Sequence, residues 1–210
     1  LQAQLEDTFD VPVWVLPNFL NHEQWDYSET LRGEALQPDA EAPIIGYFSG
    51  SASHNRDYQI ATEGLRAVLE AYPQAKLRIA GYLDIPAALE DFSTRIERLP
   101  FMDFLGLQRA IAEMTLNLSP IQHNVFAHSK SELKYFEAAA VGVPTVASPA
   151  PVFTETITHG DNGYLADAAQ WPEVLLEALA DTQNRNRVAD RALAHVGEHY
   201  LAATMTPRIT

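Results

Sequence analysis

The chain has 210 residues, of which 47% are hydrophobic and 20% charged, so it can bury a substantial core as one domain with an appendage or as half of a two-domain protein. Its 28 acidic and 14 basic residues give a formal net charge of −14, which disfavours nonspecific binding to nucleic acid or to an anionic membrane. The absence of cysteine excludes disulfides and thiolate metal sites.

The sequence contains neither an apolar run long enough to span a membrane nor a signal-peptide pattern, and its seven histidines are scattered along the chain. We therefore expect no metal site. Because the chain begins at Leu1 rather than Met, we expect a truncated piece that lacks targeting or acceptor-binding elements. The expected location is cytoplasmic, or peripheral to a membrane through sequence that this piece lacks.

Residues 1–43 are predicted to be a hinge and linker segment that follows a missing N-terminal domain. Residues 1–7 are typical of a helix end, residues 11–16 of an edge strand, and residues 21–25 of a single helical turn. From residue 28 to residue 43 the composition becomes acidic, polar and proline-containing without a clear period, which indicates a linker.

Strands and helices alternate after this segment. The alternation predicts an α/β domain over residues 44–210, with a Rossmann-like parallel sheet and helices on both faces. The predicted strands are 44–48, 76–80, 96–99, 116–118, 145–147 and 164–165. The predicted helices are 57–72, one from 103, one from about 130, 152–157, 171–179 and 185–200. Since ligands of such sheets bind beyond the carboxyl ends of the strands, the loops that leave the strands are expected to share a ligand edge.

The stretch 126–148 has the pattern of a loop, a capped helix, a sharp stop and a buried strand. Ser129 followed three residues later by Glu132 is a capping box, which predicts that the helix begins near Lys130. Gly142 stands where a left-handed residue commonly ends a helix. The segment is therefore predicted to be an αβ unit whose helix starts on an exposed loop.

Two lysines at this helix start oppose its dipole. A helix N-terminus carries partial positive charge, so lysines there are disfavoured by roughly 0.3–1 kcal/mol each. Lys130 and Lys134 are nevertheless expected to lie on one face of the first turn, with Glu137 one turn further along. This arrangement indicates a bound anion such as a phosphate. The alternative is a solvated face on which Glu132 and Glu137 neutralise the lysines.

Six segments, in this order and at these spacings, resemble the C-terminal, nucleotide-sugar-binding domain of a GT-B glycosyltransferase. The closest resemblance is to the large retaining group called glycosyl transferases group 1, or family four. The matching segments are 15–18, 46–50, 77–81, 116–120, 137–148 and 155–163, of which 137–148 has the pattern Glu-Ala-x-Ala-x-Gly-x-Pro-x-Val-Ala-Ser. Together they span nearly the whole chain.

The resemblance implies an enzyme that transfers a glycosyl group from a nucleoside diphosphate sugar, without a cofactor or a bound metal. A missing N-terminal domain would hold the glycan, lipid-linked or other acceptor, so the fragment alone would bind donor without turning it over. Neither nucleic-acid binding nor membrane insertion is expected. Two other interpretations stay open, namely another GT-B activity such as a sugar-nucleotide epimerase or phosphorylase, and a catalytically silent GT-B-like module that binds a nucleotide or a partner.

The resemblance also implies roles for individual positions. The paired glutamates of the family fall on Ser129 and Glu137. Glu137 is expected to hold the ribose hydroxyls, or else simply to pair with Lys134. Ser129 replaces the glutamate that would touch the transferred sugar, so it either retains part of that contact or serves only as a helix cap.

The remaining roles concern the diphosphate and the base. Backbone amides of residues 131–133 would face the pyrophosphate, and the backbone near 99–101 would meet the base, with the Phe101 side chain packed in the core. The phosphate-binding Arg and Lys of the family have no clean counterpart, because Arg56 is the only cation in that loop and can equally be a surface residue. Lys130 and Lys134 are expected to supply that charge. No residue is assigned as catalytic, and the expected donor-binding residues are Gly50, Ser51, His54, Arg56, Ser129, Lys130, Ser131, Glu132, Leu133, Lys134 and Glu137.

Overall fold

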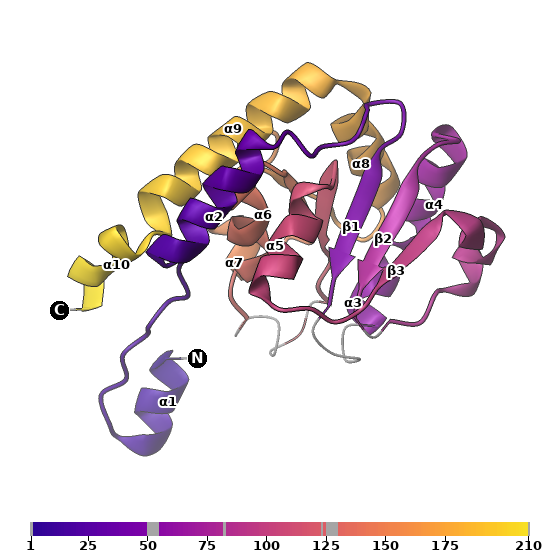
Figure 1. Ribbon diagram of the computed structural model, residues 1–210. Coiled ribbons are helices and arrows are strands. Elements are labelled where there is room, and N and C mark those ends of the chain that lie inside the picture. The colour runs from indigo at the N-terminus through magenta and orange to yellow at the C-terminus, as the bar shows by residue number, and fades with distance from the viewer. Residues whose placement is uncertain (1, 50–54, 82, 123, 125–129, 210) are drawn as a thin grey trace.

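The structure is a computed structural model that describes residues 2–49, 55–81, 83–122, 124 and 130–209. Within this part of the chain, six parallel strands form one sheet (Figure 1). The strands are β1 (Ile44–Phe48), β2 (Lys76–Ala80), β3 (Ile96–Leu99), β4 (Leu116–Ser119), β5 (Thr145–Ala147) and β6 (Tyr164–Leu165). The α/β fold class and these strands confirm the sequence predictions.

The strand order is β3-β2-β1-β4-β5-β6, so the direction of progression reverses between β1 and β4. Loops that leave two such strands run to opposite sides, and open α/β sheets bind ligands in the crevice that this creates. The central strands are covered on both faces, which explains why β1 is a nearly continuous apolar run and why all four residues of β4, two of them polar, are buried. The sheet therefore predicts a ligand site at the carboxyl ends of these two strands.

Helices cover both faces of the sheet (Figure 1). On one face, α4 (Thr62–Ala71) and α8 (Trp171–Ala180) pack against each other over a core that includes Leu65 and Trp171. On the other face lie α5 (Phe104–Ala112) and α6 (Leu133–Ala140), against which α2 (His22–Gly33) and α9 (Thr182–His199) pack. The shorter helices are α1 (Gln2–Phe9), α3 (Asn55–Ile60), the 3-10 helix η2 (Ala87–Arg95), α7 (Pro151–Thr154) and α10 (Ala202–Ile209).

The helix α2 corrects the prediction of a single turn followed by a linker from residue 28. Asn21 and Gln24 form a capping box, in which the Gln24 backbone N–H donates to Asn21 Oδ1 at 2.8 Å and the Asn21 backbone N–H donates to Gln24 Oε1 at 2.9 Å. Leu31, in the last turn, is only 1% exposed. A capped start and one buried leucine thus extend the helix through a largely polar sequence.

Two other predicted elements differ from the structure. Residues 11–16 do not form a strand, because no neighbouring strand pairs with them within the described residues, and Trp14 is 83% exposed. The helix predicted over 57–72 is divided at Ala61 into α3 and α4. Helices η2 and α10 were not predicted. Gly142 does end α6 in the left-handed region, with a φ of 74°, as its position predicts.

The loops after β1 and β2 approach so closely at Gly81 that no side chain fits there. Gly81 has a φ of 94°, and a Cβ atom at this position would overlap the carbonyl oxygen of Ser49. Gly81→Ala is expected to lower the free energy of unfolding by about 2 kcal/mol or more, since left-handed strain of roughly 1–2 kcal/mol adds to the overlap. Urea denaturation measures the change.

The matched control is Gly160→Ala. Gly160 has a similar φ of 73°, but no atom lies within 4 Å of an added Cβ. In this variant the free energy of unfolding is expected to fall by about 1 kcal/mol, from backbone strain alone. Equal losses in the two variants would contradict the importance of the close approach at Gly81.

Candidate functional site

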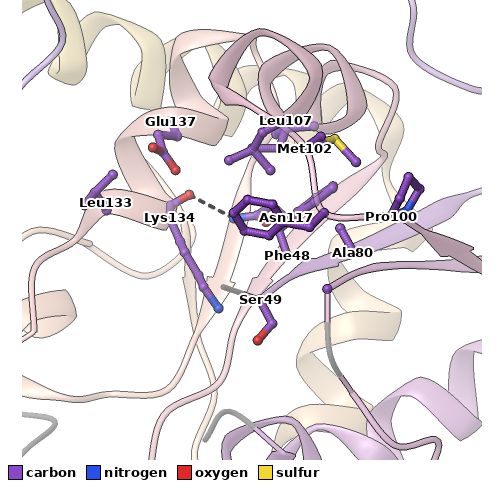
Figure 2. Close-up of a pocket in the computed structure, with 13 residues that line it drawn as sticks. Phe48, Ser49, Ala80, Pro100, Met102, Leu107, Asn117, Leu133, Lys134 and Glu137 are labelled. Atoms are coloured by element: carbon purple, nitrogen blue, oxygen red, sulfur yellow. Dashed lines mark hydrogen bonds between the residues drawn. The ribbon is translucent and has the colours of Figure 1, made fainter. Parts of the chain in front are cut away.

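A cavity of about 330 Å³ opens at the carboxyl ends of β1, β2 and β3. Its walls are mostly apolar, and its two charged side chains, Lys134 and Glu137, both come from α6. Figure 2 shows them together on one side of the cavity, whereas Pro100 and Ala80 lie on the other. The cavity thus has a charged end at α6 and an apolar end at β2 and β3.

Asn117 in β4 fixes the first turn of α6 against the sheet. Its Nδ2 donates to the carbonyl oxygen of Lys134 at 2.9 Å and to the hydroxyl of Thr145 at 3.1 Å (Figure 2). Asn117 is 1% exposed, and a polar side chain buried in a strand has to find such partners. The bond therefore sets where α6 begins relative to the reversal point of the sheet.

Lys134 is a cation without an ion-pair partner among the described residues. Its Nζ lies 4.2 Å from the centroid of the Tyr47 ring, a cation–π contact. Within the described residues no hydrogen bond or ion pair reaches the ammonium. Burial lowers the pKa of Lys134 to about 8, and the neighbouring charge of Lys130 contributes to the same shift. An ammonium so placed would be stabilised by an anion in the cavity.

Glu137, one turn further along α6, is a partly buried carboxylate. Burial raises its pKa to about 7, although the charge of Lys134 opposes this shift. The two side chains form no ion pair, so the expected alternative in which Glu137 simply pairs with Lys134 is not realised. In the part of the chain that the structure describes, no donor binds this carboxylate, which leaves it available to the hydroxyl groups of a ligand.

The start of α6 differs from the prediction. The helix begins at Leu133, and Glu132 occupies the N-cap position without a side-chain capping bond, so the predicted start near Lys130 and the capping box are wrong. Asn18 Nδ2 donates to the Ser131 hydroxyl at 2.8 Å, which ties the preceding residues to the N-terminal segment. A contact between residues far apart in sequence thus overrides the local capping pattern.

Lys130 lies outside α6 and does not share a helical face with Lys134. Its Nζ forms an ion pair with Asp57 in α3 at 3.0 Å, and both side chains are largely buried. Asp57 also accepts a bond from the Gln122 amide at 3.0 Å. Lys130 is therefore engaged with the protein and helps to hold the loop after β4 in place.

A second cavity, of about 290 Å³, lies beside the first and is lined by residues that follow β4 and precede α6. The two cavities share Leu133 and Lys134. No hydrogen bond from the backbone amides of these two residues to another described residue is formed. Two free amides at a helix start and one ammonium thus meet where the cavities join, an arrangement suited to an anion.

The structure places the other expected site residues elsewhere. Glu132 lines a separate cavity with His195 and His199, on the other side of α6. Arg56 is exposed on α3 and lines neither of the two cavities described above. Ser131 lines the second cavity. The remaining expected residues lie outside the described part of the chain: Gly50, Ser51, His54 and Ser129.

Sequence reasoning missed several lining residues. Phe101, expected in the core, is 70% exposed at the cavity. Phe48, Leu107 and Asn117 also line it, although their positions in apolar segments gave them only structural roles. The rule that ligands lie beyond the carboxyl ends of strands did point to the loop over 99–102, but not to the orientation of its side chains.

The described residues contain no group of three His, Asp or Glu side chains placed to hold a metal ion. No helix in this part of the chain has the length and apolar character required to cross a membrane.

Comparison with known proteins identifies the family and the fold. The family described as glycosyl transferases group 1 matches residues 42–184. HepE from Anabaena, in complex with UDP and glucose, is 18% identical with a TM-score of 0.63, over 90% of this chain and 52% of its own. TarM from S. aureus is 16% identical with a TM-score of 0.73, over 99% of this chain and 41% of its own. The chain thus spans about half the length of these structures or less.

A structure limited to a C-terminal domain matches over nearly its full length. This domain, from the group 1 glycosyl transferase LpcC of Francisella tularensis, is 18% identical with a TM-score of 0.57, over 89% of this chain and 95% of its own.

Glu137→Gln is expected to change how stability depends on pH. The unfolded chain has the ordinary pKa of 4.5 at this position and the folded chain about 7, so between these values the folded state holds a proton that the unfolded state has lost. The free energy of unfolding therefore falls as the pH rises through this window, by at most about 3 kcal/mol. Glutamine removes this loss, so the variant gains stability relative to the unmutated chain as the pH rises.

Urea denaturation of both proteins across the window measures the difference. Glu177→Gln, at an exposed position of α8, is the control and is expected to show no such trend. A constant difference between the Glu137→Gln variant and the unmutated chain at all pH values would contradict the prediction.

Proposed function

Because the chain belongs to the glycosyl transferases group 1 family, we propose that its two adjoining cavities bind a nucleoside diphosphate sugar. The nucleoside occupies the larger cavity, the diphosphate lies at the start of α6 where the cavities join, and the sugar extends into the smaller cavity. The observation that carries this proposal is the ammonium of Lys134 at that junction, which forms no ion pair with the described residues and lies beside two backbone amides that form no bond with them either.

Electrostatics supports the position of the diphosphate. A helix N-terminus presents partial positive charge and free N–H groups, which suit phosphate oxygens. Lys134 adds a full charge that is only partly solvated, and bonds between charged groups in such surroundings are stronger than neutral ones. Because Lys130 is held by Asp57, Lys134 carries the greater part of the cationic role that the sequence divided between the two lysines.

Glu137 lies one turn from Lys134, on the wall of the larger cavity. Its carboxylate is an acceptor without a donor among the described residues, and the paired hydroxyls of a ribose would supply donors. Keeping a partly buried carboxylate there raises its pKa and so opposes folding at neutral pH. A ligand-binding role accounts for this cost better than a structural role does.

The reaction follows from this placement. The bond between the anomeric carbon and the β-phosphate oxygen breaks, an acceptor hydroxyl forms the new glycosidic bond and loses its proton, and the nucleoside diphosphate leaves with the bonding electrons. Negative charge grows on the leaving oxygen, so Lys134 and the amides at the start of α6 would stabilise the transition state. We infer retention of anomeric configuration from the family pattern in the sequence.

The acceptor and the rest of the catalytic surface belong, in this proposal, to an N-terminal domain. The support is that the chain covers only 52% of HepE and 41% of TarM. The chain by itself would bind donor without transfer. Calorimetric titration with UDP, GDP and ADP tests the proposal, and failure of all three nucleotides to bind would refute it.

Lys134→Gln is expected to weaken nucleoside diphosphate binding about 10-fold to 100-fold, because a hydrogen bond to a charged group contributes roughly 1.5–3 kcal/mol. Lys130→Gln removes the same charge from a residue whose partner is Asp57, so a smaller loss is expected. Calorimetry with UDP on both variants gives the comparison. Equal losses would show that the lysines act as a pair.

Binding of a nucleotide sugar is expected to be strongest between about pH 7 and about pH 8. Lys134 loses its proton above a pKa of about 8, and Glu137 gains one below a pKa of about 7, so affinity falls on both sides. UDP-glucose is the appropriate probe, since its diphosphate is a diester without the terminal phosphate that titrates near pH 6. The fall at high pH should be absent in Lys134→Gln and the fall at low pH absent in Glu137→Gln.

A further inference from the structure

Phe101 is an aromatic residue that folding alone does not explain. It follows β3 directly after Pro100, lines the larger cavity, and remains 70% exposed. The nearby core contains the buried Phe48, and Met102 and Leu107 pack against it, whereas Phe101 is not part of it. The ring of Phe101 is therefore apolar surface held at the opening of an apolar cavity.

The charged and apolar residues of the cavity lie at opposite ends, which implies an orientation for a bound nucleotide. Lys134 and Glu137 lie at the α6 end, whereas Pro100 and Ala80 lie at the opposite end (Figure 2). A nucleotide whose phosphates meet Lys134 and whose ribose meets Glu137 would extend its base toward the end at which Phe101 lies. The base is the apolar, planar part of the nucleotide, and that end of the cavity is the apolar part of the wall.

We propose that the side chain of Phe101 is the platform on which the nucleobase stacks, so that this residue determines nucleoside affinity. This inference rests on the proposed function and adds to it the residue that contacts the base. Stacking on an aromatic ring is available to every base, because each has a π-face. Of the described side chains at this end of the cavity, those of Phe101 and Met102 carry no hydrogen-bond donor, so Phe101 would provide affinity with little selection among bases.

The exposure of Phe101 makes the test direct. Phe101→Ala removes a ring that contributes little to the core, so the variant should fold normally. It is expected to weaken UDP binding about 5-fold to 100-fold, the range measured for loss of one base–aromatic stack. Phe101→Tyr keeps the ring and should bind UDP as the unmutated chain does. Leu105→Ala is the control, because Leu105 is 51% exposed on α5 but does not line the cavity.

A second measurement separates stacking from a general disturbance of the site. In saturation-transfer difference NMR with UDP, the base protons should receive less magnetisation relative to the ribose protons in Phe101→Ala than in the unmutated chain. A loss of affinity with an unchanged ratio of base to ribose signals would overturn the inference.

The outcomes also separate this inference from the proposed function. If UDP binds the unmutated chain and Phe101→Ala binds it equally well, the stacking role is refuted and the donor site stands. If UDP, GDP and ADP all fail to bind the unmutated chain, the proposed function is refuted and this inference with it.

Discussion

The hydrogen bond from Asn117 to the carbonyl of Lys134 is the contact on which the site depends. It joins the first turn of α6 to β4, the strand beside the reversal point of the sheet. Because the helix is fixed there, the Lys134 side chain reaches the face of Tyr47 in β1, and Glu137 lies on the cavity wall one turn later. The amide of one buried residue in β4 thus converts a general feature of parallel sheets, an open crevice, into a cavity with a charged end.

The same desolvation acts in opposite directions on the two charged groups of that cavity. It raises the pKa of Glu137 and lowers the pKa of Lys134, so each group is less stable in its charged form than it would be in water. An ion pair between them would relieve both, yet they do not form one. Two partly buried charges that form no ion pair with each other lower the stability of the folded state. Such a loss of stability is usually found where a protein binds a ligand that offsets it.

Local sequence patterns were sufficient to predict the sheet but not the site. Strands β1 to β5 could be located because each contains aliphatic residues and is followed within two residues by a Gly or a Pro, and Gly142 could be assigned because few other residues tolerate its backbone angles. The start of α6 could not be predicted in this way, because the residues before it bind partners far away in the sequence. Ser131 binds Asn18, 113 positions away, and Lys130 binds Asp57, 73 positions away. The length of α2 was missed because a single buried leucine gives no periodic signal. The exposure of Phe101 was missed because a ring next to a strand is more often buried.

The two lysines show most clearly what the fold adds to the sequence. Their spacing predicted two equivalent cations on one helical face. The sequence alone did not indicate which of the two lysines would contribute more to binding a phosphate. The structure separates them, because Asp57 is itself buried and also binds the Gln122 amide, so it can take Lys130 as a partner without a rearrangement. Lys134 has only an aromatic face beneath it, which stabilises a cation without neutralising it. One lysine therefore completes the wall of the site, and the other keeps a charge that forms no ion pair with the described residues.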